Sequence, residues 1–117
     1  MATGTIKGQV VENLTVNMSS NFSGGVTARR MGRLVILDIV IYPNSELSEW
    51  TTYEVATING VTNYSLEAVT SLLAQNSTGS SIDCLIDGNS NKLKVSCKTV
   101  PFSASTWLRG QLVFFTK

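Results

Sequence analysis

The hydrophobic positions of this chain follow the two-residue repeat of β-strands along much of its length. Residues 93–98 alternate apolar and polar side chains, which is typical of a strand with one buried face. Residues 82–86 do nearly the same, and residues 87–91 between them (Asp-Gly-Asn-Ser-Asn) are turn formers. The two segments therefore predict an antiparallel hairpin.

Two other segments are apolar on both alternating faces, namely residues 34–41 (Leu-Val-Ile-Leu-Asp-Ile-Val-Ile) and 107–115. We expect both to be central strands covered on both sides. A small sandwich has one inner face per sheet, so the outward side chains need a second cover. These side chains include Ile36, Val40, Val113 and Phe115. Either an N-terminal arm or another copy of the chain supplies the cover, and we favour another copy.

The rest of the chain divides into an N-terminal arm and a single domain. Residues 1–23 predict an arm or two short strands, and residues 24–117 a β-sandwich domain. Residues 65–75 fit either one or two helical turns or a strand, because Leu66, Val69, Leu72 and Leu73 satisfy a helical spacing. The expected fold is therefore an all-β, antiparallel β-sandwich or jelly-roll-like barrel.

Composition and charge exclude several kinds of function. A formal net charge of +1 argues against a nucleic-acid or anionic-membrane partner. The absence of histidine removes the commonest general base, the commonest zinc ligand and every nucleophile that needs an imidazole. No apolar run is long enough to span a membrane, and no secretory leader is evident. We expect no cofactor, no metal and no membrane insertion.

The acidic residues offer one weak case for catalysis. Glu46, Glu49 and Glu54 surround Trp50 and Tyr53, but a glycosidase needs two facing carboxyls roughly 5–10 Å apart. Solvated loop acids are the simpler interpretation, and we do not expect an enzyme.

Two smaller acidic features have structural interpretations. Asp38, inside an apolar strand, is expected to face solvent or to pair with Arg29, Arg30, Arg33 or Arg109. The Asp83 and Asp87 turn lacks the spacing of a calcium loop.

Cys84 and Cys97 lie on opposite arms of the predicted hairpin. A disulfide between them is geometrically conceivable, but two buried thiols are favoured because nothing marks the chain as secreted. Neither has an evident activating neighbour, so we do not expect a catalytic thiol. Five Asn-x-Ser/Thr triplets are interpreted as turn and surface chemistry rather than glycan acceptors. They begin at Asn13, Asn17, Asn21, Asn63 and Asn76.

The large amphipathic aromatics point to binding. Trp50 lies among polar residues where core burial is hard to arrange, and an aromatic face beside carboxylates and hydroxyls suits a sugar. Tyr53, Glu49 and Tyr64 are candidate partners of Trp50 in such a site. The alternative is that Trp50 packs inward as a cap on the sandwich. Trp107 opens an apolar strand and is assigned to the core or to a subunit interface.

Residues 24–37 (GGVTARRMGRLVIL) resemble the strand, Arg-x-Gly, hydrophobic-strand opening of C-terminal receptor-binding domains in tailed-phage fibres and baseplates. Residues 53–58, 82–98 and 107–115 resemble the pieces that follow in those domains, in the same order. The chain departs by having Asn-Gly-Val at 59–61 where a proline-containing loop is usual. Residues 108–114 are also similar to the last strand of trimeric jelly rolls such as the C1q and tumour-necrosis-factor families.

Both resemblances imply a homotrimer, which fits the strands that are apolar on both faces. The subunit interface that we expect from those strands comprises Ile36, Val40, Val113, Phe115 and Trp107. The first also implies a non-catalytic adhesion module at the tail tip of a virion assembled in the host cytoplasm. Its ligand would be a host cell-surface carbohydrate, held by the Trp50–Tyr53 loop, and other virion proteins would be its partners. The alternative is a structural virion protein, such as a capsid decoration or baseplate component, with no ligand of its own.

Overall fold

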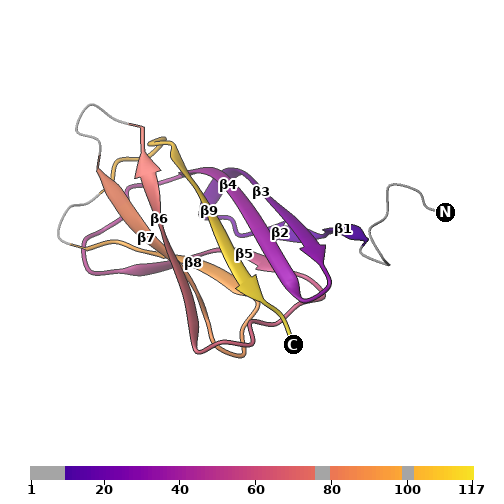
Figure 1. Ribbon diagram of the computed structural model, residues 1–117. Helices are drawn as coiled ribbons and strands as arrows, with labels where there is room; N and C mark the ends of the chain where they lie inside the picture. The colour runs from indigo at the N-terminus through magenta and orange to yellow at the C-terminus, as the bar shows by residue number, and fades with distance from the viewer. Residues whose placement is uncertain (1–9, 76–79, 99–101) are drawn as a thin grey trace.

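The computed structural model describes residues 10–75, 80–98 and 102–117, and shows nine antiparallel strands and no helix in those ranges. The strands are β1 (Val11–Leu14), β2 (Val16–Met18), β3 (Phe22–Met31), β4 (Leu34–Pro43), β5 (Thr52–Ile58), β6 (Glu67–Ala74), β7 (Ser81–Asp87), β8 (Lys92–Ser96) and β9 (Leu108–Phe115). They form one strongly curved sheet, a nearly closed barrel with the character of a sandwich (Figure 1). The predicted all-β, antiparallel, single-domain fold is confirmed.

The sheet order is β1-β3-β4-β9-β6-β7-β8-β5-β2, so the two edges of the sheet are consecutive in sequence. Only Thr15 separates β1 from β2, yet β1 pairs with β3 and β2 pairs with β5. Residues 11–18 therefore run from one edge of the sheet to the other and hold the barrel together. Residues 1–9 of the expected arm lie outside the described residues.

The core is filled by alternate side chains of the central strands, as the period of a strand requires. In β4, Val35, Leu37, Ile39 and Ile41 all point inward and are fully buried. The expected hairpin is present as β7 and β8, with Ile86 opposite Leu93 and a turn between them. Within residues 65–75, for which helix and strand were both open, Glu67–Ala74 form strand β6, which pairs with β7 from Glu67 to Leu73.

Strand β3 approaches β4 unusually closely at Gly24. Its φ is +94°, and a Cβ built on it would lie 2.3 Å from the backbone oxygen of Val40. The next residue, Gly25, has no heavy atom within 4 Å of its ideal Cβ position. Only glycine fits the first position, because the conflict combines a left-handed backbone with a contact to main chain.

Asn63 is the buried polar centre of one end of the barrel. Its Nδ2 donates to the carbonyl oxygens of Ile86 (3.0 Å) and Asp87 (3.3 Å), and its Oδ1 accepts from the N–H of Ser65 (3.0 Å). The side chain is completely buried, so this Asn-x-Ser triplet is not the surface feature that we expected: its asparagine satisfies backbone groups inside the barrel.

Candidate functional site

The Trp50 loop, residues 44–51 between β4 and β5, presents the most exposed tryptophan of the described chain. Trp50 is 70% exposed, so it does not pack inward as a cap on the sandwich, which was the alternative interpretation. Its φ is +58°, a conformation that a bulky residue rarely adopts. The backbone N–H of Trp50 donates to the carbonyl oxygen of Lys98 at 2.9 Å, which fixes the loop beside the end of β8.

Three further contacts hold the Trp50 loop against the barrel. Leu47 is buried and exchanges backbone hydrogen bonds with Phe102 (2.8 and 3.1 Å). The N–H of Ser48 donates to the Tyr53 hydroxyl at 2.8 Å, while the Tyr53 ring packs against the core. The N–H of Cys97 donates to the carbonyl oxygen of Thr51 at 2.9 Å. Tyr53 is therefore a support of the loop, and Trp50 is its exposed element.

The acidic residues of this region are all solvent-exposed. Glu46 and Glu49 lie in the Trp50 loop, and Glu54 lies on β5 next to Lys94 of β8. The Glu49 carbonyl oxygen accepts from the Thr51 hydroxyl at 3.1 Å, which orders the backbone beside Trp50. The loop thus carries an exposed indole with carboxylate and hydroxyl residues beside it in sequence.

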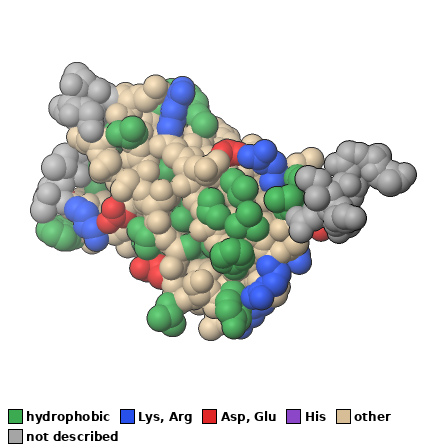
Figure 2. Space-filling view, viewed as in Figure 1, with side chains coloured by type: hydrophobic (Ala, Val, Ile, Leu, Met, Phe, Trp, Pro, Cys, Tyr) green, Lys and Arg blue, Asp and Glu red, His purple; other side chains and the backbone are tan. Residues whose placement is uncertain are grey.

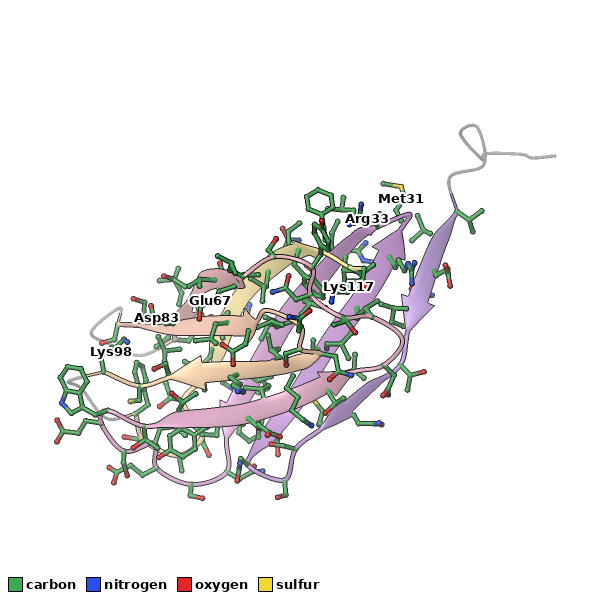
Figure 3. All side chains as sticks on the ribbon, turned by 90° about the horizontal axis from the view of Figure 1, so that it is seen from below. Met31, Arg33, Glu67, Asp83, Lys98 and Lys117 are labelled. Atoms are coloured by element: carbon green, nitrogen blue, oxygen red, sulfur yellow. The ribbon has the colours of Figure 1, made fainter. Side chains whose placement is uncertain are left out.

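Tyr64 lies at the other end of the barrel from the Trp50 loop. Its N–H donates to the carbonyl oxygen of Phe115 at 2.8 Å, and the guanidinium carbon of Arg33 lies 4.8 Å from its ring centroid. Figure 3 labels Arg33 at one end of the molecule and Lys98, the partner of Trp50, at the other. The structure therefore brings together Trp50, Glu49 and Tyr53 but not Tyr64. The Tyr64 side chain is 62% exposed, while its backbone is held by the hydrogen bond to Phe115.

The second conspicuous surface is the outer face, defined as the outward side of β1, β3, β4, β9 and β6. The predicted interface residues Ile36 and Val40 on β4, and Val113 and Phe115 on β9, all lie on it. Ile36 is directly opposite Val113, and Phe115 is 54% exposed. The space-filling view shows hydrophobic side chains gathered over β9 and β4 (Figure 2).

The apolar surface extends beyond these predicted residues. On β6, Val69 and Leu73 are also exposed. Trp107, just before β9, packs edge-on against Tyr42 of β4 with ring centroids 4.6 Å apart. The described part of the expected arm, residues 10–23, is built into the sheet: β1 and β2 form its two edges, and residues 22–23 begin β3.

One polar cluster interrupts the outer face. Asp38 accepts hydrogen bonds from Arg29 on β3 (2.6 Å) and from Gln111 on β9 (2.9 Å). Four arginines were possible partners of Asp38, and the structure shows that Arg29 is the one that pairs with it. The cluster satisfies its own charges, so it leaves the face neutral at its centre.

A hollow of about 190 Å³ lies where β1, β3 and β4 meet on this face. It is lined by Val11, Arg29, Arg30, Met31 and Ile36. Its walls are mostly apolar, and the guanidinium of Arg30 is directed elsewhere, because it donates to the carbonyl oxygens of Gly32 (2.8 Å) and Gly60 (3.5 Å).

The two cysteines are buried thiols, as favoured from the sequence. The register places Cys84 opposite Val95, so Cys97 is its diagonal and not its direct neighbour. Burial raises the pKa of Cys84 to about 12, and burial also raises the pKa of Cys97. Both therefore stay protonated at neutral pH and are poor nucleophiles.

The described residues contain no group of three or more acidic, cysteine or histidine side chains that could hold a metal ion. In the same part of the chain, no helix has the length and hydrophobicity of a membrane span.

Sequence reasoning did not find Leu66 or the β6 contribution to the outer face. The signal was available in residues 67–74, where buried Ala68, Leu72 and Ala74 alternate with exposed neighbours.

Comparison with known families, curated proteins and solved structures gives no match to this chain.

Proposed function

We propose that this chain is a non-catalytic binding module of a tailed-phage virion that recognises a host cell-surface saccharide through the Trp50 loop. The observation that carries the proposal is the exposed indole of Trp50 on a left-handed backbone. A bulky residue in this conformation costs roughly 1–2 kcal/mol relative to glycine. Such strain persists where the surrounding structure over-determines it, and it concentrates at binding sites.

The chemistry around the indole supports a sugar ligand. Apolar C–H faces of a pyranose stack on an aromatic ring, while its hydroxyls need carboxylate, amide or hydroxyl partners. Glu49, Thr51 and Thr52 supply such groups beside Trp50 in sequence, and the loop backbone is held by four separate anchors. A preorganised loop loses little conformational entropy on binding, which favours even a small contact.

Self-association into a trimer is the second part of the proposal. The outer face exposes apolar residues on each of its five neighbouring strands, and contiguous apolar surface of this kind often marks a contact between proteins. A homotrimer would present three Trp50 loops, and linked weak sites gain avidity if they reach their ligands simultaneously.

Binding is tested with a glycan array and a host-envelope pulldown. Trp50→Gly removes the indole and relieves the backbone strain, so it should lose binding yet unfold at the same or a higher temperature. The matched control is Tyr64→Ala, which removes an exposed aromatic at the other end of the barrel and should bind like wild type. Equal binding by wild type and Trp50→Gly would overturn the Trp50 site.

Self-association is tested by light scattering. Wild type should scatter as about three times the 12.6 kDa chain. Val113→Glu should shift the mass toward the monomer, because it places a charge in the outer face. Thr52→Glu, at an exposed position of β5 outside the outer face, is the matched control and should leave the mass unchanged. A monomeric wild type would contradict this part of the proposal.

The outer face also supports a second candidate function, a structural virion protein without a ligand. Its apolar surface would serve assembly alone. Assembly onto particles with no binding to any host-envelope fraction would favour this candidate over the first.

A further inference from the structure

A row of polar side chains crosses the outward side of β7, β8 and β5, where β8 ends and β5 begins. Asp83 is directly opposite Ser96, and Ser96 is directly opposite Thr52. The Thr52 hydroxyl donates to the Ser96 hydroxyl oxygen at 3.4 Å. Neighbouring strands lie about 4.8 Å apart, so the row is roughly 10 Å wide. A carboxylate and two hydroxyl groups therefore lie side by side on one ordered surface.

Lys98 connects this polar row to the Trp50 loop. Its carbonyl oxygen accepts a hydrogen bond from the N–H of Trp50 at 2.9 Å, and its Nζ lies 3.8 Å from a carboxylate oxygen of Asp83. Figure 3 labels Lys98 and Asp83 at the same end of the molecule. Because Lys98 bonds to the Trp50 backbone and also pairs with Asp83, the loop lies next to the polar row.

The Lys98–Asp83 pair is loose and open to solvent. Its separation of 3.8 Å exceeds the roughly 2.7–2.9 Å of a charge-assisted hydrogen bond, and the two side chains are 58% and 44% exposed. The Lys94–Asp87 pair on the same two strands is tighter, at 3.0 Å, and the Lys94 side chain is only 28% exposed. Asp83 and Lys98 therefore keep hydrogen-bonding capacity that Asp87 and Lys94 use on each other.

The ionic groups of Asp83, Lys98 and Glu49 are negative on balance. Burial raises the pKa of the Cys97 thiol and the Glu49 carboxylate raises it further, so this carboxylate lies near residue 97, next to Lys98. An acidic saccharide would meet the carboxylates of Asp83 and Glu49 against the ammonium of Lys98. An uncharged saccharide meets no such repulsion, so the charges favour it.

The donors and acceptors of this surface match the hydroxyl groups of a sugar. A carboxylate has two acceptor oxygens, so Asp83 can accept from two adjacent hydroxyl groups at once. The Lys98 ammonium only donates, and it can donate to a sugar oxygen, whereas the hydroxyls of Ser96 and Thr52 both donate and accept. The exposed indole of Trp50 supplies the stacking surface.

We infer that the ligand of the Trp50 loop is an uncharged saccharide with two adjacent free hydroxyl groups, which Asp83 and Lys98 bind while a sugar ring stacks on Trp50. The site then extends from the loop onto the ends of β8 and β7. The inference rests on the proposed function and specifies its ligand class and polar contacts. A saccharide without these hydroxyl groups leaves a charged side chain without its partner and loses affinity.

Fractionated host-envelope polysaccharide tests the ligand class. Anion exchange separates an uncharged pool from an acidic pool, and periodate cleaves saccharides between adjacent free hydroxyl groups. Wild type should bind the uncharged pool about tenfold or more tightly than the acidic pool, and periodate treatment of the uncharged pool should abolish binding. Tighter binding to the acidic pool, or full binding after periodate treatment, would overturn the inference.

Two substitutions test the residues, each with a matched control. Asp83→Asn keeps the shape of the side chain and removes its charge, and Lys98→Met removes the ammonium, so each should weaken binding to the uncharged pool about tenfold or more. Asp87→Asn and Lys94→Met make the same changes in the tighter pair and should bind like wild type. Exposed ion pairs contribute little to stability, so all four variants should melt close to wild type.

The outcomes separate this inference from the proposed function. If Trp50→Gly loses binding while Asp83→Asn and Lys98→Met bind like wild type, the inference is wrong and the Trp50 site is retained. Equal losses in all four ion-pair variants would also contradict the inference, because the two pairs would then be equivalent. If Trp50→Gly binds like wild type, or wild type binds neither pool, the proposed function fails together with the inference.

Discussion

Replacing Gly24 by alanine should destabilise the barrel far more than the same change at Gly25. At Gly24 the new Cβ meets main chain of β4, with the Val40 oxygen at 2.3 Å and the Ile41 Cα at 2.9 Å. Neither atom can rotate away, so β3 and β4 must move apart. The φ of +94° adds a backbone penalty of its own.

The magnitude follows from these two effects. The left-handed backbone costs about 1–2 kcal/mol for a residue with a Cβ. Weakening two backbone hydrogen bonds of the β3–β4 ladder costs about 2 kcal/mol more. The sum of about 3–4 kcal/mol is a large part of the roughly 5–15 kcal/mol that stabilises a typical domain. With an unfolding entropy near 2.1 cal/mol/K per residue, it lowers Tm by roughly 12–16 °C.

Gly25→Ala is the matched control, one residue away on the same strand. No heavy atom lies within 4 Å of its ideal Cβ position. Alanine there should be neutral or stabilise by up to about 1 kcal/mol, by restricting the unfolded chain. Thermal and urea unfolding followed by circular dichroism measure both variants. A Gly24→Ala loss below about 1 kcal/mol, or equal losses for the two variants, would refute the close-approach argument.

Two more predictions concern buried groups. Asn63→Ala leaves two carbonyl oxygens and one N–H without their side-chain partner, so it should cost about 2–3 kcal/mol in urea unfolding; exposed Asn13→Ala should cost almost nothing. Because the pKa of Cys84 is raised from 9.0 to about 12, the folded state retains its proton longer than the unfolded state. Stability should therefore fall by up to about 1.4 kcal/mol per pH unit between pH 9 and 12, and Cys84→Ala should reduce that slope; an unchanged slope would contradict the assignment.

The strands that could be predicted from sequence are those in which the alternation of apolar and polar side chains, or a run of β-branched residues, lies within the strand itself. The β7–β8 hairpin combines alternation with a turn-rich linker, and β4 is β-branched throughout. The outward positions Val40 and Val113 could be identified as needing a cover because a strand places alternate residues on opposite faces. The helix-or-strand question at residues 65–75 had no local answer, since pairing with β7 decided it.

The candidate site was less predictable because it depends on long-range pairing. Trp50 and Tyr64 are close in sequence, but Trp50 bonds to Lys98 and Tyr64 to Phe115, which lie at opposite ends of the barrel. The positive φ of Trp50 is likewise imposed by its tertiary contacts and has no signature in the residue type. The hollow beside Met31 exists only because β1 pairs with β3 there.

The strand order also dictates when a nascent chain can fold. Strand β9, the last of the nine to be translated, lies between β4 and β6. Val16 pairs with Ile58, so at about 5–20 residues per second the ribosome needs roughly 2–8 s to supply the partner of β2. Until β9 emerges, the edges of β4 and β6 remain open to wrong pairing with other chains. During synthesis the edges of β4 and β6 therefore stay unpaired until β9 has been made, a period in which they can pair with strands of other chains.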